Sequence, residues 1–291
     1  MIRGVLGAEQ TTDRPSEAPV AGRCADIRRV YPALVFVPLF YLLVRYAPPS
    51  AFFGLVAAAA AVALLEFFRL HFKEKPSLGA RGLGLSLLGL LLASLQWPGV
   101  LSERSVFLLV LLSVLIWRMG SRRELRSGLA DSAVLVFGTL YIGLTLGTLL
   151  LTRSLPDGEF LIFFVFLVTW AGDTGAYYSG LYLGRHRLAP TISPNKTVEG
   201  LAGAFVFALG GALLARAWFL PSFSLGDCLA TGLLLTVAGV LGDLAESTLK
   251  RSAGVKDSGS VIPAHGGMLD RLDSLLFTAP VFYYYATLVK G

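Results

Sequence analysis

The segment Ser247–Asp273 reads STLKRSAGVKDSGSVIPAHGGMLDRLD and separates two long apolar runs near the end of the chain. Its basic residues, Lys250, Arg251, Lys256 and Arg271, have the charge and the hydrogen-bond donors to bind phosphates. Its aspartates supply the oxygen ligands that a hard divalent cation prefers. The segment therefore predicts a place where an anionic substrate and a metal ion meet at the edge of an apolar region.

The chain around this segment is strongly apolar. Hydrophobic residues make up 55% of its 291 residues, charged residues only 15%, and the mean hydropathy is +0.68. Soluble domains carry about 25% charged residues, so the composition predicts a membrane protein. The net charge of +6 does not indicate nucleic-acid binding, because the basic residues lie in separate short loops between apolar runs. The two cysteines, Cys24 and Cys228, fit neither a disulfide framework nor a zinc site.

Apolar segments predict an all-α polytopic fold with about nine transmembrane helices, since a crossing takes about 20 residues. Residues 1–26 are polar, so we expect a disordered cytosolic tail ahead of one transmembrane catalytic domain, residues 27–291. The expected helices are approximately Val30–Tyr46, Ala51–Phe68, Leu83–Trp97, Ser105–Trp117, Ala130–Leu151, Phe160–Leu183, Gly200–Phe219, Asp227–Ser247 and Asp270–Val289.

The distribution of basic residues predicts the orientation of these helices. With a cytosolic N-terminus and nine crossings, all but five of the 25 lysines and arginines fall on the cytosolic side. The exceptions are Arg45, Arg104, Arg153, Arg216 and Lys290. Because positive residues concentrate in cytoplasmic loops, we expect the N-terminus inside and the C-terminus outside.

Asp173 lies inside the expected sixth helix, about 13 residues past Phe160 or roughly 20 Å along the axis. A charge at the bilayer centre costs on the order of 3 kcal/mol, so this carboxylate needs a partner or a water-filled cavity. Small residues around it, Gly172, Gly175 and Gly180, allow close helix packing or close approach of a ligand.

Two further helices carry carboxylates toward the same side of the membrane. Asp243, Glu246 and Lys250 share one face of the eighth helix at positions i, i+3 and i+7. Asp270 and Asp273 open the ninth helix at i and i+3. Since three helices bring carboxylates to the inner half of the membrane, the pattern favours a functional site over structural pairing.

Glu66 gives no comparable signal. It lies near the inner end of the second helix, three residues before Arg69, and the spacing predicts an interfacial ion pair without a function.

Two polar loops complete the candidate site. The first loop is Gly184–Gly200. We expect it to form a helix N-terminus that binds an anion, built from Ser193 or Asn195 and the amides near Thr197, with Lys196 adding positive charge. Alone, such a basic loop is usually only a determinant of topology.

The second loop contributes Ser258, Gly259, Gly266 and Gly267, whose hydroxyl and amides suit a phosphate nest. For His265 the roles of base, ligand and hinge contact all stay open.

The pattern Ser247-x2-Lys-Arg-x4-Lys-Asp-x-Gly-x3-Pro-x-His-Gly-Gly-x2-Asp-Arg-x-Asp273 resembles the signature of phosphatidate cytidylyltransferases, also called CDP-diacylglycerol synthases. Asp173-Thr-Gly-Ala-Tyr177 and Ser193-Pro-Asn-Lys-Thr-x-Glu-Gly200 also resemble bacterial members of this family. The resemblance is strongest over residues 170–273.

The resemblance implies transfer of a cytidylyl group from CTP to phosphatidic acid, giving CDP-diacylglycerol and pyrophosphate for phospholipid biosynthesis. It also implies a Mg2+-dependent homodimer in the bacterial inner membrane, with its active site facing the cytosol. Such a reaction needs no strong general base, because the attacking lipid phosphate is already anionic.

Roles of individual residues follow from the resemblance together with depth and spacing. Asp243 and Asp270 would be the principal Mg2+ ligands, with Glu246 and Asp173 as further ligands, Asp273 beside them, and room for a second cation. Other catalytic groups would be Lys196, Lys250, Arg251 and Lys256. Substrate binding would involve Ser193, Thr197, Ser258, Gly259, His265, Gly266, Gly267 and Arg271.

Two other functions fit the sequence less well. A CTP-dependent polyprenol or phytol kinase would transfer the terminal phosphoryl group to an alcohol and would need a base for the hydroxyl. An ion-coupled transporter would also carry intramembrane carboxylates, but the loop dense in lysine, glycine and histidine argues against it.

Overall fold

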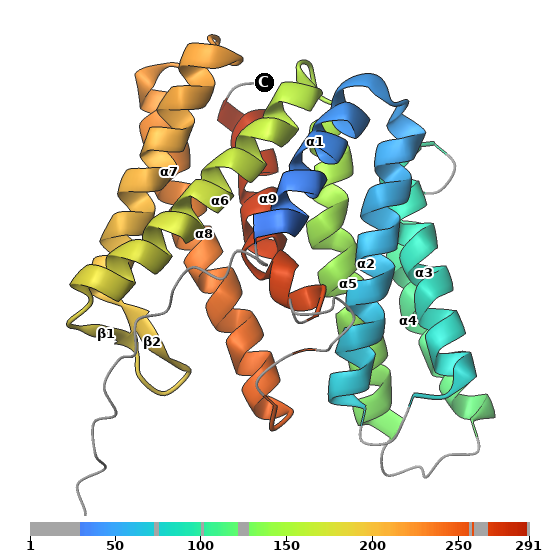
Figure 1. Cartoon of the computed structure of the whole chain (residues 1–291). Coiled ribbons are helices and arrows are strands. Elements are labelled where there is room, and N and C mark those ends of the chain that lie inside the picture. The colour runs from blue at the N-terminus through green and yellow to red at the C-terminus, as the bar shows by residue number, and fades with distance from the viewer. Residues whose placement is uncertain are drawn as a thin grey trace, which may run out of the picture.

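The computed structural model describes residues 30–72, 76–99, 102–121, 128–255, 258 and 267–289. These residues form nine α-helices and one small antiparallel sheet (Figure 1). The elements are α1 Val30–Tyr46, α2 Pro49–His71, α3 Leu78–Gln96, α4 Glu103–Gly120, α5 Gly128–Arg153, α6 Gly158–Leu183, β1 Arg187–Ala189, β2 Ser193–Thr197, α7 Val198–Trp218, α8 Leu225–Ser252 and α9 Leu269–Val289.

The helical fold predicted from the apolar segments is confirmed, because each expected segment coincides with one helix to within a few residues. Seven of the helices in the described ranges are long and apolar enough to cross a membrane, namely α2, α3 and α5–α9. Within α1, Phe36–Tyr46 is a shorter apolar helical stretch. Helix α4 has 18 residues but carries Glu103, Arg104 and Arg118 near its ends.

Hydroxyl side chains mark the starts of several helices. Ser77, Ser102 and Thr197 each accept a hydrogen bond from a backbone amide in the first turn of α3, α4 and α7. At α8, Ser224 and Asp227 form a capping box. Such caps satisfy amides that have no partner within the helix, so they fix where each apolar run becomes helical.

The loop between α6 and α7 differs from the expectation. Residues Ser193–Thr197 form strand β2, paired antiparallel with β1, because Pro194 disfavours a helical conformation at the residue before it. The expected helix N-terminus at Ser193 or Asn195 is therefore wrong. Helix α7 begins later, where the Thr197 hydroxyl accepts a hydrogen bond from the Gly200 amide at 3.1 Å.

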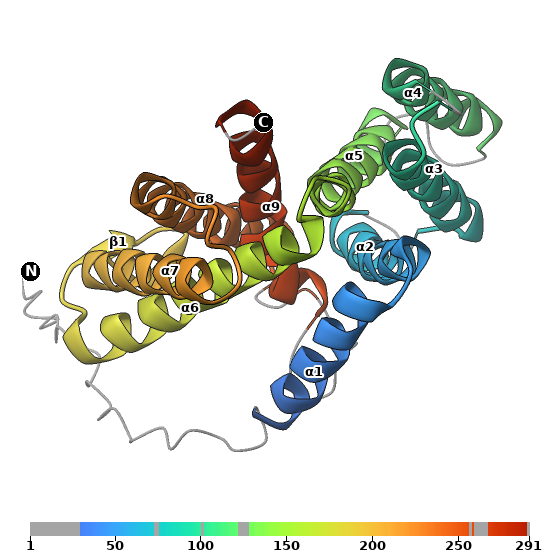
Figure 2. The ribbon, with the colours of Figure 1, turned by 90° about the horizontal axis from the view of Figure 1, so that it is seen from above.

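The helices form two groups joined through α5 and α9. Viewed from above, α6, α7 and α8 lie together on one side of the molecule and α2–α5 on the other, with α9 between them (Figure 2). Helix α9 packs against both α8 and α5, and a smaller contact connects it with α2. The start of α9 is thereby placed between the two groups.

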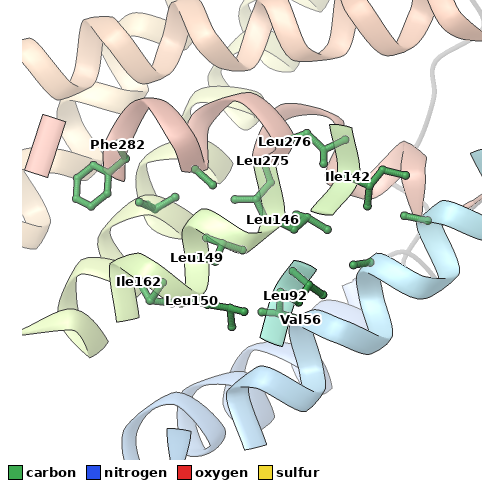
Figure 3. Packing of buried hydrophobic residues seen from close by; sticks show 14 of the residues in the cluster. Val56, Leu92, Ile142, Leu146, Leu149, Leu150, Ile162, Leu275, Leu276 and Phe282 are labelled. Carbon is green, nitrogen blue, oxygen red and sulfur yellow. The ribbon is translucent and has the colours of Figure 1, made fainter. Parts of the chain in front are cut away.

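Buried side chains of α5 and α9 form the core between the two groups (Figure 3). Leu146 and Leu149 of α5 lie toward Leu275 and Leu276 of α9, and Leu150 points to the other side of α5. All five are less than a tenth exposed. This apolar contact holds α9 and sets the position of the polar residues at its first turn.

Small residues bring α6 and α7 into close contact, as expected for helix packing in membranes. A Cβ atom added at Gly175 of α6 would lie 2.5 Å from the Gly203 carbonyl oxygen and 2.6 Å from Cβ of Phe207. Backbone atoms cannot yield to such a contact, so the close packing depends on glycine at position 175.

We predict that Gly175→Ala lowers the thermal melting temperature of the detergent-solubilised protein. Overpacking of this kind costs about 1–3 kcal/mol. Gly210→Ala is the matched control, because Gly210 lies on α7 and a Cβ atom there would have nothing within 4 Å. Equal melting temperatures for the two variants would contradict the close α6–α7 contact.

Candidate active site

The predicted site residues gather where α8 ends, α9 begins and the β1–β2 hairpin reaches the bundle (Figure 1). Four of them, Lys256, Gly259, His265 and Gly266, lie outside the described residues. The others come from α6, β2, α8, α9 and the two described positions Ser258 and Gly267.

Asp270, in the first turn of α9, has one carboxylate oxygen saturated with hydrogen bonds. Its Oδ2 accepts from the Ser258 amide at 3.0 Å, the Ser258 hydroxyl at 2.8 Å and the Gly267 amide at 3.0 Å. The other oxygen, Oδ1, accepts from Lys250 Nζ at 2.6 Å. The three donors fix the carboxylate plane, so Oδ1 is the oxygen that can change partners.

Lys250 connects α8 with α9. Besides Asp270, its ammonium lies 3.4 Å from Oε1 of Glu246, one turn earlier on α8. Glu246 is only 1% exposed, and neither of its oxygens accepts a hydrogen bond within the described part of the chain. Asp273 and Asp270 lie close enough to repel it. Buried acceptors of this kind are costly unless a cation compensates them.

Lys196 brings the hairpin to α8. Its ammonium forms an ion pair with Oδ2 of Asp243 at 2.7 Å and donates to the Val240 carbonyl at 3.4 Å. The hairpin itself is held by Glu199, whose Oε2 accepts from the amides of Arg185 and His186 at 3.0 and 3.2 Å. The lysine that sequence analysis assigned to phosphate binding therefore lies directly on a predicted metal ligand.

Asp173 extends the cluster into α6. Its Oδ1 accepts from the Ser274 hydroxyl of α9 at 3.2 Å, and it interacts electrostatically with Asp273, Asp243 and Lys196. It also lines a hollow of about 270 Å3, part of which is open to the outside. The hollow lies between α6, α7 and α8 and is lined by Val168, Thr169, Gly172, Asp173, Ala176, Ala204, Leu235, Thr236, Gly239 and Val240.

Close approach of α8 and α9 makes this convergence possible. A Cβ atom at Gly242 would collide with the Asp273 carbonyl oxygen and would lie 3.2 Å from the Phe277 side chain. Glycine at 242 therefore allows Asp243 and Glu246 on α8 to lie beside Asp273 on α9, and the three carboxylates interact electrostatically.

The remaining predicted residues have more peripheral positions. Thr197 uses its hydroxyl to cap α7, and Ser193 begins β2. Arg251 and Arg271 are exposed and follow Lys250 and Asp270 in the chain.

Glu66 was not predicted as a site residue, yet it touches this region. It is 1% exposed, and its carboxylate accepts hydrogen bonds from the amides of Met268 and Leu269 at 3.0 and 2.8 Å. The expected interfacial ion pair with Arg69 is wrong, because the carboxylate points to the start of α9 instead. A glutamate among apolar residues was the only local signal, and its partners lie about 200 positions away in the chain.

The donor set fits a hard cation. Asp173, Asp243, Glu246, Asp270 and Asp273 supply carboxylate oxygens. The observation that favours a cation here is buried Glu246: its oxygens accept no hydrogen bond within the described residues, and the Lys250 ammonium 3.4 Å away is shared with Asp270. Within the described ranges, no three histidine, cysteine, aspartate or glutamate side chains are close enough to form a metal site by themselves. Mg2+ usually binds through one or two carboxylates together with phosphate oxygens and water, so this arrangement suits it.

The fold and the cluster together define a multi-pass membrane protein that holds carboxylates and lysines between its apolar helices. Comparison with known proteins places it in a family. The model of the cytidylyltransferase family matches residues 27–289, so the chain belongs to that family.

Relatives in this family carry the name phosphatidate cytidylyltransferase. The protein from Bacillus subtilis is 36% identical over 264 residues, which cover 89% of this chain and 95% of that protein. One from Staphylococcus saprophyticus is 38% identical over 202 residues, covering 68% and 76%. One from Staphylococcus aureus is 34% identical over 254 residues, covering 85% and 92%.

Proposed function

We propose that this protein transfers the cytidylyl group of CTP to phosphatidic acid and forms CDP-diacylglycerol and pyrophosphate. The observation that carries the proposal is the cluster of carboxylates and lysines contributed by α6, β2, α8 and α9. The names of relatives that align with most of the chain support it.

The reaction makes one P–O bond and breaks another. An oxygen of the lipid phosphate attacks the α-phosphorus of CTP, and the bond from that phosphorus to the bridging oxygen of the β-phosphate breaks. Pyrophosphate leaves with the bonding electrons. The nucleophile is already an anion, so no strong general base is needed. What the site must supply is alignment and neutralisation of negative charge.

Lys196 and Lys250 are suited to that neutralisation because each presents an ammonium to the cluster. In the structure they are paired with Asp243 and Asp270. We infer that both lysines turn to phosphate oxygens when substrate binds, since a lysine is a flexible point charge with several donors. The carboxylates then need a new cation.

Asp243 and Asp270 are the residues we assign to holding Mg2+, with Glu246, Asp173 and Asp273 nearby as further ligands or for a second cation. Bound there, Mg2+ would neutralise phosphate charge during transfer. Oδ1 of Asp270 is the oxygen for this role, because Oδ2 already accepts three hydrogen bonds.

The same proposal includes the arrangement in the membrane. We propose nine crossings in a bacterial inner membrane, a cytosolic N-terminal tail of residues 1–26, an active site facing the cytosol, and a homodimer. The distribution of lysine and arginine supports the orientation. A cytosolic site also lets a soluble nucleotide and a lipid headgroup meet.

We predict that purified protein given phosphatidic acid and labelled CTP places the α label in the lipid and releases pyrophosphate. The measurement compares α- and γ-labelled CTP by thin-layer chromatography of the extracted lipid. Lipid carrying only the γ label would indicate a kinase. Ion or solute transport without nucleotide turnover would indicate a transporter.

We predict that Asp243→Asn and Asp270→Asn each lower kcat by at least about 100-fold, equivalent to about 3 kcal/mol in the barrier. Each substitution keeps the size of the side chain but removes a charge that a cation needs. Asp157→Asn is the matched control, because Asp157 is exposed in the turn before α6, at the other end of that helix from the hairpin. Near-normal Mg2+-dependent turnover in a folded Asp270→Asn protein would contradict the assignment.

Orientation is tested with single cysteines in a protein whose Cys24 and Cys228 are replaced by alanine. Asn195→Cys on the hairpin and Asp157→Cys before α6 are both at exposed positions. We expect a membrane-impermeant thiol reagent to label position 157 in intact cells and position 195 only after permeabilisation. The reverse pattern would place the site outside the cytosol.

A further inference from the structure

We propose that Glu66 is a positioning residue for the reaction: from α2 it holds the first backbone amides of α9 and thereby sets the orientation of the Asp270 carboxylate. This inference rests on the proposed function, in which Asp270 acts. Glu66 itself would touch neither substrate.

Three successive amides at the start of α9 all donate to carboxylates. The Gly267 amide donates to Oδ2 of Asp270, the Met268 amide to Oε1 of Glu66 and the Leu269 amide to Oε2 of Glu66. The first amides of a helix have no partner within the helix, and a negative charge there is favoured by the helix dipole. The three amides at the start of α9 are therefore held by two carboxylates, one of Asp270 and one of Glu66.

The two carboxylates are also connected through Ser258 and Gly267. The Ser258 hydroxyl donates to Asp270 at 2.8 Å and lies 3.4 Å from Oε2 of Glu66. A Cβ atom at Gly267 would collide with that hydroxyl and would lie 2.7 Å from Oε2 of Glu66. The space between Glu66 and Asp270 is thus filled, so movement of one carboxylate displaces the groups that hold the other.

Glu66 reaches this place from the other helical group. It lies on α2, whose other buried residues, such as Phe67 and Phe68, belong to the apolar core. Apart from this carboxylate, no residue of α2 has a hydrogen bond to the described residues of the 258–270 region. The partners of this buried carboxylate are thus backbone amides of α9 and not groups of α2, so its role lies at the start of α9.

A positioning role predicts a particular kinetic pattern. Displacement of a catalytic group by about 1 Å costs on the order of 100-fold in rate. Because Glu66 lies behind Asp270 and not among the phosphate-binding lysines, its loss should act on kcat and leave substrate affinity nearly unchanged.

The test uses Glu66→Gln in the full-length protein. Glutamine keeps the size, but its one carbonyl oxygen accepts from only one of the two amides and its NH2 group faces the other. We expect kcat to fall about 10- to 100-fold, with KM for CTP and phosphatidic acid within about threefold of wild type. In the ligand-free protein, we expect the amides of residues 267–269 to exchange hydrogen at least about tenfold faster.

Two controls separate positioning from stability and from charge. Gly143→Ala disturbs the α3–α5 contact, since its Cβ atom would lie 2.7 Å from the Leu91 side chain. Arg69→Gln removes an exposed charge from α2, three residues from Glu66. We expect both controls to keep wild-type kcat and wild-type exchange at residues 267–269, whatever their melting temperatures. If Glu66→Gln does not fold, Glu66→Asp replaces it: the shorter side chain keeps the charge but not the reach to both amides, so we expect kcat to fall by up to about 10-fold with KM nearly unchanged.

Four results would overturn the proposal: unchanged kcat in Glu66→Gln, unchanged exchange at residues 267–269, a rise in KM in place of the fall in kcat, or an equal loss of kcat in Gly143→Ala. Faster exchange with unchanged kcat would make Glu66 a structural cap only. If the wild-type protein makes no CDP-lipid, the proposed function fails separately, and exchange in the ligand-free protein still decides whether Glu66 holds the start of α9.

Discussion

Carboxylates within an apolar helical bundle need partners, and this requirement organises the charged cluster of the protein. Asp243 is paired with Lys196, Asp270 with Lys250, and Asp173 with the Ser274 hydroxyl. Removing one partner of a buried pair costs about 3–5 kcal/mol, because the other charge is left uncompensated. The hairpin, α6, α8 and α9 are therefore connected by their charges as well as by their apolar faces.

Packing supplies the geometry that these pairs need. Helices α8 and α9 approach closely at Gly242, and α6 and α7 at Gly175, where side chains larger than hydrogen would meet backbone oxygens. The apolar contact between α5 and α9 then fixes the position of α9 along its own axis. Since Asp270 is in the first turn of α9, the position of an apolar helix decides the position of this carboxylate.

The sequence predicts much of this arrangement but not all of it. Apolar segments of sufficient length identify the helices, and carboxylates at depth identify Asp173, Asp243 and Asp270 as members of one site. The hairpin was missed because it has only a few paired residues and no apolar alternation. Glu66 was misread because its partners are backbone amides of a distant helix, and backbone partners leave no pattern in the sequence.

The sequence did not predict the pairing of lysine with aspartate. It assigned the lysines to phosphates and the aspartates to a metal ion. Their contact has a consequence for the order of events in the proposed reaction. A cation that displaced Lys250 from Asp270 would leave the ammonium, only 14% exposed, without its shorter ion pair and with Glu246 at 3.4 Å. A triphosphate that attracted the lysine would leave the carboxylate uncompensated. Binding of the cation alone or of the triphosphate alone therefore breaks the ion pair without replacing both of its halves. Binding of the two together gives Asp270 the cation and Lys250 the phosphate. The paired arrangement therefore favours joint binding of nucleotide and cation over binding of either one.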